Sequence, residues 1–263
     1  KNIVNGEKNF LIYGPLKDEL KNAKSIIDIG CGAGYLTNSI SYVFPDKKVL
    51  GIDFNSVATE RAKKVSDNLN LHSKFKSFDL FNYKADSKFD LAISIGVLMH
   101  TNDCLGGLEH IIKKIIKKNG KIYIGLYNKY GRKPFLDYFN KLKKNGCNND
   151  ILFKKYSELH SKLKDKTHLN SWFRDQIQHP HETQLSIKDI IEFLKELNFR
   201  IKCSSINKFK ELKFSEEYGY DKHELNDLFS AEKNMEKIGL KALEEKRYYP
   251  GFFTFLAEPK KKN

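Results

Sequence analysis

The sequence lacks the paired cysteines and the long apolar runs that mark several classes of protein. Its four cysteines form no C-x-x-C pair, which argues against a zinc ribbon or a disulfide framework and favours a reducing cytoplasm. No apolar run approaches the roughly 18 residues of a transmembrane helix, and no charged and apolar leader precedes the first expected strand. We therefore expect a cytoplasmic protein without a membrane partner. The chain begins at Lys1 rather than at a methionine, which fits a fragment or a processed protein.

Arginine is scarce in a chain that is otherwise strongly basic. The formal net charge is +14, yet only five basic residues are arginine and all the others are lysine. A basic surface is typical of phosphate binding, but recognition of phosphates and bases depends largely on the two-pronged contacts of arginine. The lysines are spread over most of the expected helices and over the end Pro259–Asn263, which indicates solvated faces and a frayed tail. Nucleic-acid binding is therefore the weaker interpretation.

Apolar runs alternate with amphipathic stretches along most of the chain, which predicts an α/β fold with a mostly parallel sheet. With 40% hydrophobic residues, 263 positions can bury one substantial core. Ser186 and Asp189 predict a capping box at the start of a helix. We expect helices at Gly34–Val43, Ser56–Asn68, Cys104–Lys117 and Ile187–Leu197. We expect strands at Ser25–Ile29, Lys48–Ile52, Ser73–Phe78, Leu91–Ile95, Lys121–Leu126, Phe199–Ile206 and Phe252–Ala257.

A glycine-rich turn follows the first expected strand. Residues 26–37 are Ile-Ile-Asp-Ile-Gly-Cys-Gly-Ala-Gly-Tyr-Leu-Thr, so glycines at three alternate positions lead from a strand into a helix. Such glycines leave backbone N–H groups uncovered and let a ligand approach the main chain closely. The dinucleotide fingerprint requires its third glycine where Tyr35 stands, which argues against a nicotinamide dehydrogenase.

The spacing Asp-x-Gly-x-Gly-x-Gly resembles the first motif of class I S-adenosylmethionine-dependent methyltransferases, in particular small-molecule bacterial members. The resemblance covers residues 22–126 and then 186–206 and 250–258. It implies a seven-stranded, mostly parallel Rossmann-like sheet with an antiparallel last strand and helices on both faces, in a single domain over residues 1–263. Residues 127–185 and 207–249 are left over. Connections this long in a compact domain are usually functional, so we expect helical insertions that form a substrate lid.

The resemblance implies a site for S-adenosyl-L-methionine, with S-adenosyl-L-homocysteine as the product. Asp28 is expected to meet the ammonium group of the cofactor. At the end of the second strand, Asp53 is expected to accept both ribose hydroxyls, and Phe54 to cover one face of the adenine. The turn beneath the methionine part of the cofactor would be formed by Gly30, Cys31, Gly32 and Gly34.

The third and fourth strands supply the remaining cofactor contacts that the resemblance implies. Asp79 would bind the adenine amino group and the backbone N–H of Leu80 a ring nitrogen, although Asp86 and Asp90 are rival acids nearby. The carboxyl end of a central strand is where open α/β sheets bind ligands. The ends of the third and fourth strands therefore face the cofactor, and the resemblance places Ser94 and Ile95 beside the transferable methyl group.

Histidines occur at two places, after the fourth expected strand and in the loop before the helix expected at Ile187–Leu197. Residues 96–101 are similar to a Gly-Val-Leu-His-His-Thr segment of the family, with Met99 in place of the first histidine. His100 is then a general base, a hydrogen-bond partner of the substrate or a packed polar residue. In Gln-His-Pro-His-Glu-Thr (178–183), His179 and His181 are expected in the lid, with one of them placed to take a proton. A metal site in this loop is less favoured because no further ligand lies at suitable spacing.

Polar residues near the insertions are candidates for acceptor binding. Tyr127 and Arg132 follow the fifth strand, and Arg132 could hold a carboxylate or phosphate by a two-pronged contact, or these residues could pack and cap the chain. Glu182 is expected to line the lid. The aromatic stretches 217–220 and 247–249 either cover the pocket or pack.

The favoured interpretation is a methyltransferase that acts on a polar small molecule through O-, N- or C-methylation. Two alternatives remain. The first is an RNA or protein methyltransferase guided by the basic surface, and the second is a non-catalytic cofactor-binding partner subunit.

Overall fold

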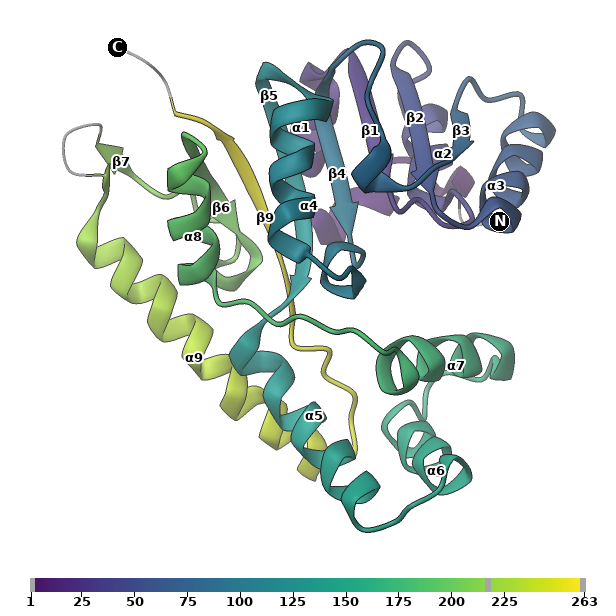
Figure 1. Cartoon of the computed structure of the whole chain (residues 1–263), viewed down its shortest axis with the longest axis vertical. Coiled ribbons are helices and arrows are strands. Elements are labelled where there is room, and N and C mark those ends of the chain that lie inside the picture. Colours follow the sequence, from purple (N-terminus) through teal and green to yellow (C-terminus); the bar gives the residue numbers. More distant parts are fainter. Residues whose placement is uncertain (1–2, 216–218, 261–263) are drawn as a thin grey trace.

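The computed structural model describes residues 3–215 and 219–260 and has one large sheet with helices on both faces (Figure 1). Residues 216–218 of the second insertion, with Glu217 and Tyr218 of the aromatic stretch, lie outside the described residues, as do residues 261–263 of the lysine-rich end. The strands are β1 (Ser25–Ile29), β2 (Lys48–Asp53), β3 (Lys74–Ser77), β4 (Phe89–Ile95), β5 (Ile116–Tyr127), β6 (Phe199–Ser204), β7 (Phe214–Ser215), β8 (Gly219–Tyr220) and β9 (Phe252–Pro259).

The helices alternate with these strands in the first part of the chain and gather in the two insertions later. They are α1 (Leu16–Asn22), α2 (Tyr35–Val43), α3 (Ser56–Asn68), α4 (Cys104–His110), α5 (Lys129–Lys144), α6 (Asn149–Leu159), α7 (Lys166–Phe173), α8 (Ile187–Glu196) and α9 (Lys222–Glu244). Short 3-10 turns lie at Ile3–Tyr13, Leu80–Asn82, Leu98–His100 and Ser205–Asn207, and π-helical turns at Ile111–Ile115 and Arg174–Gln178.

The large sheet has the order β3-β2-β1-β4-β5-β9-β6, which confirms the predicted seven strands and the mostly parallel α/β fold. Only β9 runs antiparallel to its neighbours, β5 and β6. The central strands are buried on both faces, as expected of a parallel sheet covered by helices. One face packs against α1 and α2, and the other against α4 and α8.

Several element boundaries differ from the prediction, most of them by one or two residues. The helix expected at Cys104–Lys117 ends at His110, continues as the π-helical turn and gives way to β5 at Ile116. The reason is that Ile116 already pairs with Phe89 of β4, and a register shift separates this pair from the rest of the ladder. The strand expected at Phe199–Ile206 ends at Ser204. At the start of α8, the predicted capping box of Ser186 and Asp189 is confirmed.

The insertions form a helical cap beyond the carboxyl ends of the central strands. Helices α5, α6 and α7 come from the first insertion, and α9 from the second packs along α5 (Figure 1). The cap has an aromatic core of its own that includes Phe135, Phe139 and Tyr156. None of the helices in the described ranges has the length and apolar character needed to cross a membrane.

Candidate functional site

The glycine turn after β1 has a backbone that other residues adopt with difficulty. Gly30, Gly32 and Gly34 have φ values of 72°, 51° and 76°. A Cβ atom on Gly30 would lie 2.2 Å from Val97 Cγ2, so glycine is also required there by space. A Cβ on Gly32 would meet no atom within 4 Å. The turn therefore presents main chain, not side chain, to open space above β1.

Asp53 at the end of β2 is joined to this turn. Its carboxylate accepts hydrogen bonds from the backbone N–H of Gly32 and of Asn55, both over 2.8 Å. Asn55 in turn caps α3. The half-buried carboxylate of Asp53 is thus fixed at the sheet edge, one residue before the largely exposed ring of Phe54.

A cavity of about 440 Å³ opens at this edge of the sheet. It lies beyond the carboxyl ends of β1 and β2, and the strand order reverses between β1 and its neighbour β4, which is the usual ligand position in an open α/β sheet. Phe54 is 83% exposed, and Phe78 and Phe81 are 42% and 39% exposed, so apolar rings form part of its rim. The lining consists of Ile29, Gly30, Ile52, Asp53, Phe54, Phe78, Asp79, Leu80, Phe81, Val97, His100, Thr101 and Asn102.

Asp79 both lines the cavity and caps the turn that follows it. Its Oδ1 accepts from Phe81 N over 3.1 Å, and its Oδ2 accepts from Asn82 Nδ2 over 2.7 Å. Leu80 is buried beside it. The rival acid Asp90 lies instead at the start of β4, where it binds Ser25 and Lys117. Asp86 lies beside Lys76, at the amino ends of the strands rather than the carboxyl ends.

Asp28 and Ser94 are buried beneath the cavity and are not part of its lining. Asp28 Oδ2 accepts a hydrogen bond from Thr37 Oγ1 over 2.6 Å. Burial raises the pKa of Asp28 to about 6, against the opposing effect of this hydrogen bond. Ser94 Oγ is buried without a hydrogen-bond partner. Burial also raises the pKa of the Cys31 thiol, so this side chain is not a reactive thiolate.

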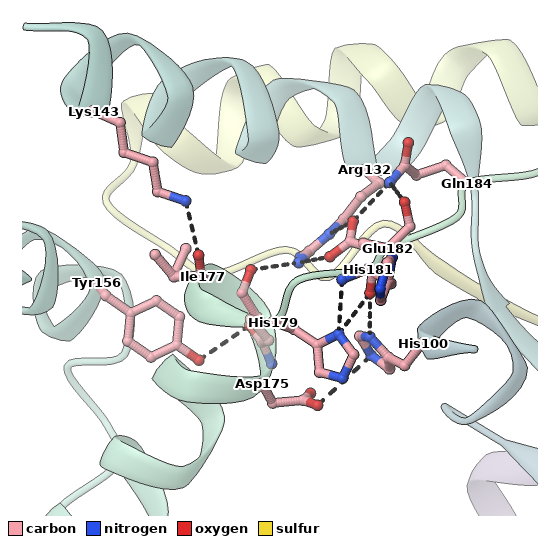
Figure 2. A network of polar contacts seen from close by, with 11 residues as sticks. His100, Arg132, Lys143, Tyr156, Asp175, Ile177, His179, His181, Glu182 and Gln184 are labelled. Carbon is pink, nitrogen blue, oxygen red and sulfur yellow. Dashed lines mark hydrogen bonds and ion pairs between the residues drawn. The ribbon is translucent and has the colours of Figure 1, made fainter. Parts of the chain in front are cut away.

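The structure brings the three predicted histidines together (Figure 2). His100 Nδ1 lies 3.2 Å from the carbonyl oxygen of His181, and His179 Nδ1 lies 2.7 Å from the same oxygen. The rings of His100 and His179 are 4.4 Å apart. His100 also lies edge-on to Tyr127, with a centroid separation of 5.8 Å.

Main-chain bonds hold the histidine loop against the strand ends. Thr183 N donates to the carbonyl of Met99 over 2.8 Å, beside His100. Two residues later, Leu185 N donates to the carbonyl of Tyr127, and Lys129 N donates to the carbonyl of Leu185. A segment that is 80 residues from His100 in sequence thereby becomes part of the same site.

Arg132 and Glu182 bind each other. Arg132 Nε and Nη2 donate to the two carboxylate oxygens of Glu182 over 2.9 and 2.8 Å, and Nη2 also donates to the carbonyl of Gln176. The guanidinium is fully buried and lies over the rings of Tyr127 and Phe135, 4.0 and 4.2 Å from their centroids. The two-pronged contact of Arg132 is made with a carboxylate of the chain, whereas we expected a carboxylate or phosphate of the acceptor.

Two acidic residues lie at the site although no sequence motif predicted them there. Asp175, in the π-helical turn before the histidine loop, places Oδ1 3.7 Å from His100 Nε2. Buried Glu232 of α9 accepts from Asn128 Nδ2 and from Ile187 N, both over 2.5 Å, and so joins α9 to the end of β5 and the start of α8. Neither acid belongs to a recognisable motif. In the described part of the chain, no cluster of three or more His, Cys, Asp or Glu side chains is arranged for a metal ion.

A comparison with protein families matches residues 20–193, more than half of the chain, to the family described as "Methyltransferase domain". The chain belongs to this family of methyltransferase domains. This match confirms the methyltransferase family that the residues of the glycine turn predicted.

Curated methyltransferases are similar to part of the chain. A candidate methyltransferase, 235L, of Invertebrate iridescent virus 6 is 36% identical over 119 residues, which is 44% of this chain and 41% of the viral protein. Malonyl-[acyl-carrier protein] O-methyltransferase of Acetivibrio thermocellus is 31% identical over 100 residues, which is 38% of this chain and 34% of that enzyme. The match thus spans well under half of these relatives. Others are named as ribosomal RNA and ribosomal protein methyltransferases.

Among solved structures, PKMT2 from Rickettsia typhi has a similar fold. The TM-score is 0.66 at 16% identity, covering 93% of this chain and 50% of PKMT2. Identity this low shows the fold alone. The methyltransferase domain therefore has the class I architecture that its sheet order indicates.

Proposed function

We propose that this methyltransferase domain transfers the methyl group of S-adenosyl-L-methionine and releases S-adenosyl-L-homocysteine. The observation that supports this most strongly is the cavity of about 440 Å³ between the glycine turn and Asp53. Open main chain lies on one side of it, a fixed carboxylate on the next strand and apolar rings at its rim. These are suitable partners for an amino acid portion, a ribose and an adenine, respectively.

Several of the predicted cofactor contacts belong to residues that line the cavity, whereas Asp28 and Ser94 lie beneath it. Asp53 would accept the ribose hydroxyls, Phe54 would cover the adenine, and Asp79 with the backbone of Leu80 would bind its polar edge. Asp28 would meet the ammonium group from below the turn. Beside the methyl group would lie Ser94 and Ile95.

The sulfonium of the bound cofactor supplies an electrophilic methyl group, so the chain has mainly to align the acceptor and exclude water. The helical cap and the histidine loop are placed for this, because both lie against the carboxyl ends of β4 and β5. We propose that the two insertions form a substrate lid on a single domain. Arg132 and Glu182 would shape the acceptor site by holding the loop, together with Tyr127.

We propose that the acceptor is a polar small molecule. We also propose that the protein is cytoplasmic. A capped site that is closed by main-chain bonds suits a small acceptor better than a duplex. The formal net charge of +14 supports an RNA or an acidic protein as the alternative acceptor. Binding of a 20-nucleotide single-stranded RNA, measured by fluorescence anisotropy, separates the two. Weak binding that vanishes at about 0.15 M salt favours the small acceptor, and tight binding at that salt favours RNA.

The cofactor proposal is tested by calorimetry with S-adenosyl-L-homocysteine. We expect the wild-type chain to bind it and Asp53→Ala to weaken binding by about 100-fold, because two charge-assisted hydrogen bonds are lost. Asp53→Asn keeps the shape of the side chain, and its affinity is expected to lie between those of the wild type and Asp53→Ala. Asp46→Ala, at an exposed residue on the opposite edge, is the control. Equal affinity in wild type and Asp53→Ala would remove Asp53 from the site, and no binding by the wild type would refute the function.

A further inference from the structure

His100 has different surroundings at its two ring nitrogens. Nδ1 lies 3.2 Å from the carbonyl oxygen of His181, and a carbonyl oxygen only accepts hydrogen bonds. The contact therefore requires the proton of the neutral ring to be on Nδ1. Nε2 then keeps its lone pair, and this atom is buried without a hydrogen-bond partner. An imidazole held in this tautomer is ready to accept a proton at Nε2.

Asp175 faces the nitrogen that carries the lone pair. Its Oδ1 lies 3.7 Å from Nε2, which is too long for a hydrogen bond and short enough for an ion pair (Figure 2). The other titratable rings packed against His100 are those of His179 and Tyr127. Once Nε2 is protonated, both nitrogens of the ring face an acceptor, so the charged ring is stabilised by the His181 carbonyl and by Asp175.

The other two histidines are less suited to take a proton from the acceptor. His179 Nδ1 contacts the same carbonyl oxygen of His181 as His100 does, so this contact alone does not separate the two rings, and their positions relative to the cavity do. Of the three, His100 is the one in the lining of the cavity at the sheet edge, as far as the described residues go. It also lies in the 3-10 turn that follows β4, at the carboxyl end of that central strand.

We propose that His100 is the base of the transfer reaction and that Asp175 is a positioning residue which stabilises its charged form. The acceptor is then one whose nucleophilic atom loses a proton on methylation, such as a hydroxyl. The oxygen–carbon bond forms as the carbon–sulfur bond breaks, the electron pair of that bond goes to sulfur, and the proton goes to Nε2 of His100. This inference rests on the proposed function.

The test is nitrogen NMR of the full chain labelled with ¹⁵N-histidine, which reports where each ring carries its protons. The chain has eight histidines, and the His100 signals are identified by their loss in His100→Gln. We expect the neutral ring of His100 to carry its proton on Nδ1. At about pH 6.5, where a histidine is partly charged, we expect the charged fraction of this ring to fall by about twofold or more in Asp175→Asn.

The matched control is Asp165→Asn. Asp165 lies 3.6 Å from His168 on the exposed surface of the cap and also caps a helix, a role that asparagine retains. It should leave the His100 signals unchanged. A neutral ring with its proton on Nε2, or an unaltered charged fraction in Asp175→Asn, would overturn the inference. Calorimetry with S-adenosyl-L-homocysteine on the same samples decides the proposed function separately, since cofactor binding does not depend on the tautomer of His100.

Discussion

At the scale of single residues, the most unusual feature is a fully buried guanidinium beside the candidate site. Burial by itself would lower the pKa of Arg132, but Glu182 and the phenol rings of Tyr127 and Tyr248 hold it above its ordinary value. A buried charge is tolerated only when it is well paired, and removal of one partner leaves the other uncompensated. The pair fastens the histidine loop to α5, so its loss should affect the site as well as the stability.

A double-mutant cycle with Arg132→Met and Glu182→Gln measures this pair. We expect each single variant to lower the free energy of unfolding by about 3 kcal/mol and the coupling energy to be on the order of 2 kcal/mol, by urea denaturation. Arg247 and Glu245 form an exposed pair with similar two-nitrogen contacts, at 3.3 and 3.1 Å. Their coupling should be below about 0.5 kcal/mol. Similar coupling in both pairs would show that Arg132 does not hold the loop.

The sequence identified both members of this pair but not their relation. Arg132 and Glu182 were each predicted to contact the acceptor, because each is a charged residue next to a strand end or in a polar loop. Their pairing depends on how the chain between them folds, and no local pattern encodes that. The same holds for Asp175, whose position opposite His100 becomes visible only in three dimensions.

At the scale of elements, two glycines let the cap meet the sheet. Gly251, just before β9, packs directly on Gly131 at the start of α5, and its carbonyl accepts from Asn128 N over 2.7 Å. A Cβ on Gly251 would lie 2.2 Å from the carbonyl carbon of Gly131, which is main chain and cannot turn away. The entry of β9 into the sheet therefore needs glycine both for space and for its φ of 60°.

Gly251→Ala should lower the free energy of unfolding by at least about 3 kcal/mol, through backbone strain and overlap with α5. Gly146→Ala is the matched control, because Gly146 has a φ of 78° but no atom within 4 Å of an added Cβ. It should cost only about 1 kcal/mol, the strain alone. Chemical denaturation compares the two, and equal costs would contradict a tight contact between β9 and α5.

The strands were easier to predict than the cap helices. Buried parallel strands are apolar throughout, so β1 and β4 stand out in the sequence. The length of the two insertions predicted helices in them but did not place α5 to α7 or α9. Pro134 lies inside α5, and the cap helices bury aromatic side chains against partners that are remote in sequence. Local periodicity does not identify such partners.

At the scale of the whole molecule, two buried groups give the stability opposite dependences on pH. Burial lowers the pKa of His160, in the aromatic core of the cap, to about 4. The unfolded chain then binds a proton more readily, so the stability due to neutral His160 is present above about pH 6.5 and is lost as the pH falls toward 4. The raised pKa of Asp28 acts the other way, since its contribution is present at low pH and is lost as the pH rises through about 6.

His160→Phe isolates the first effect. Between pH 7.5 and 5, we expect the wild type to lose on the order of 1–2 kcal/mol relative to the variant, measured as the change in the difference between their unfolding free energies. His168→Gln, at an exposed histidine of the same cap, should show no such change. If the difference in unfolding free energy from the wild type changes with pH equally for both variants, His160 is not held neutral in the cap.

The half of the site that we propose for the cofactor was more predictable than the half that we propose for the acceptor, for a reason that concerns the whole molecule. The residues of the proposed cofactor half follow directly on parallel strands, and the carboxyl ends of such strands meet at one edge. Gly30 of the glycine turn, Asp53 and Asp79 therefore line one cavity at this edge. The acceptor half is made of insertions, whose position is fixed by contacts such as that of Glu232 with Asn128.

The position of β9 affects how the protein folds while it is synthesised on the ribosome. Of the described strands it is synthesised last, yet it is sandwiched between β5 and β6. Until Phe252–Pro259 leaves the exit tunnel, the edges of β5 and β6 that pair with β9 stay unpaired, and unpaired edges are templates for aggregation. The nascent chain can fold its amino-terminal half early, but it can close its sheet only after translation has passed the whole cap.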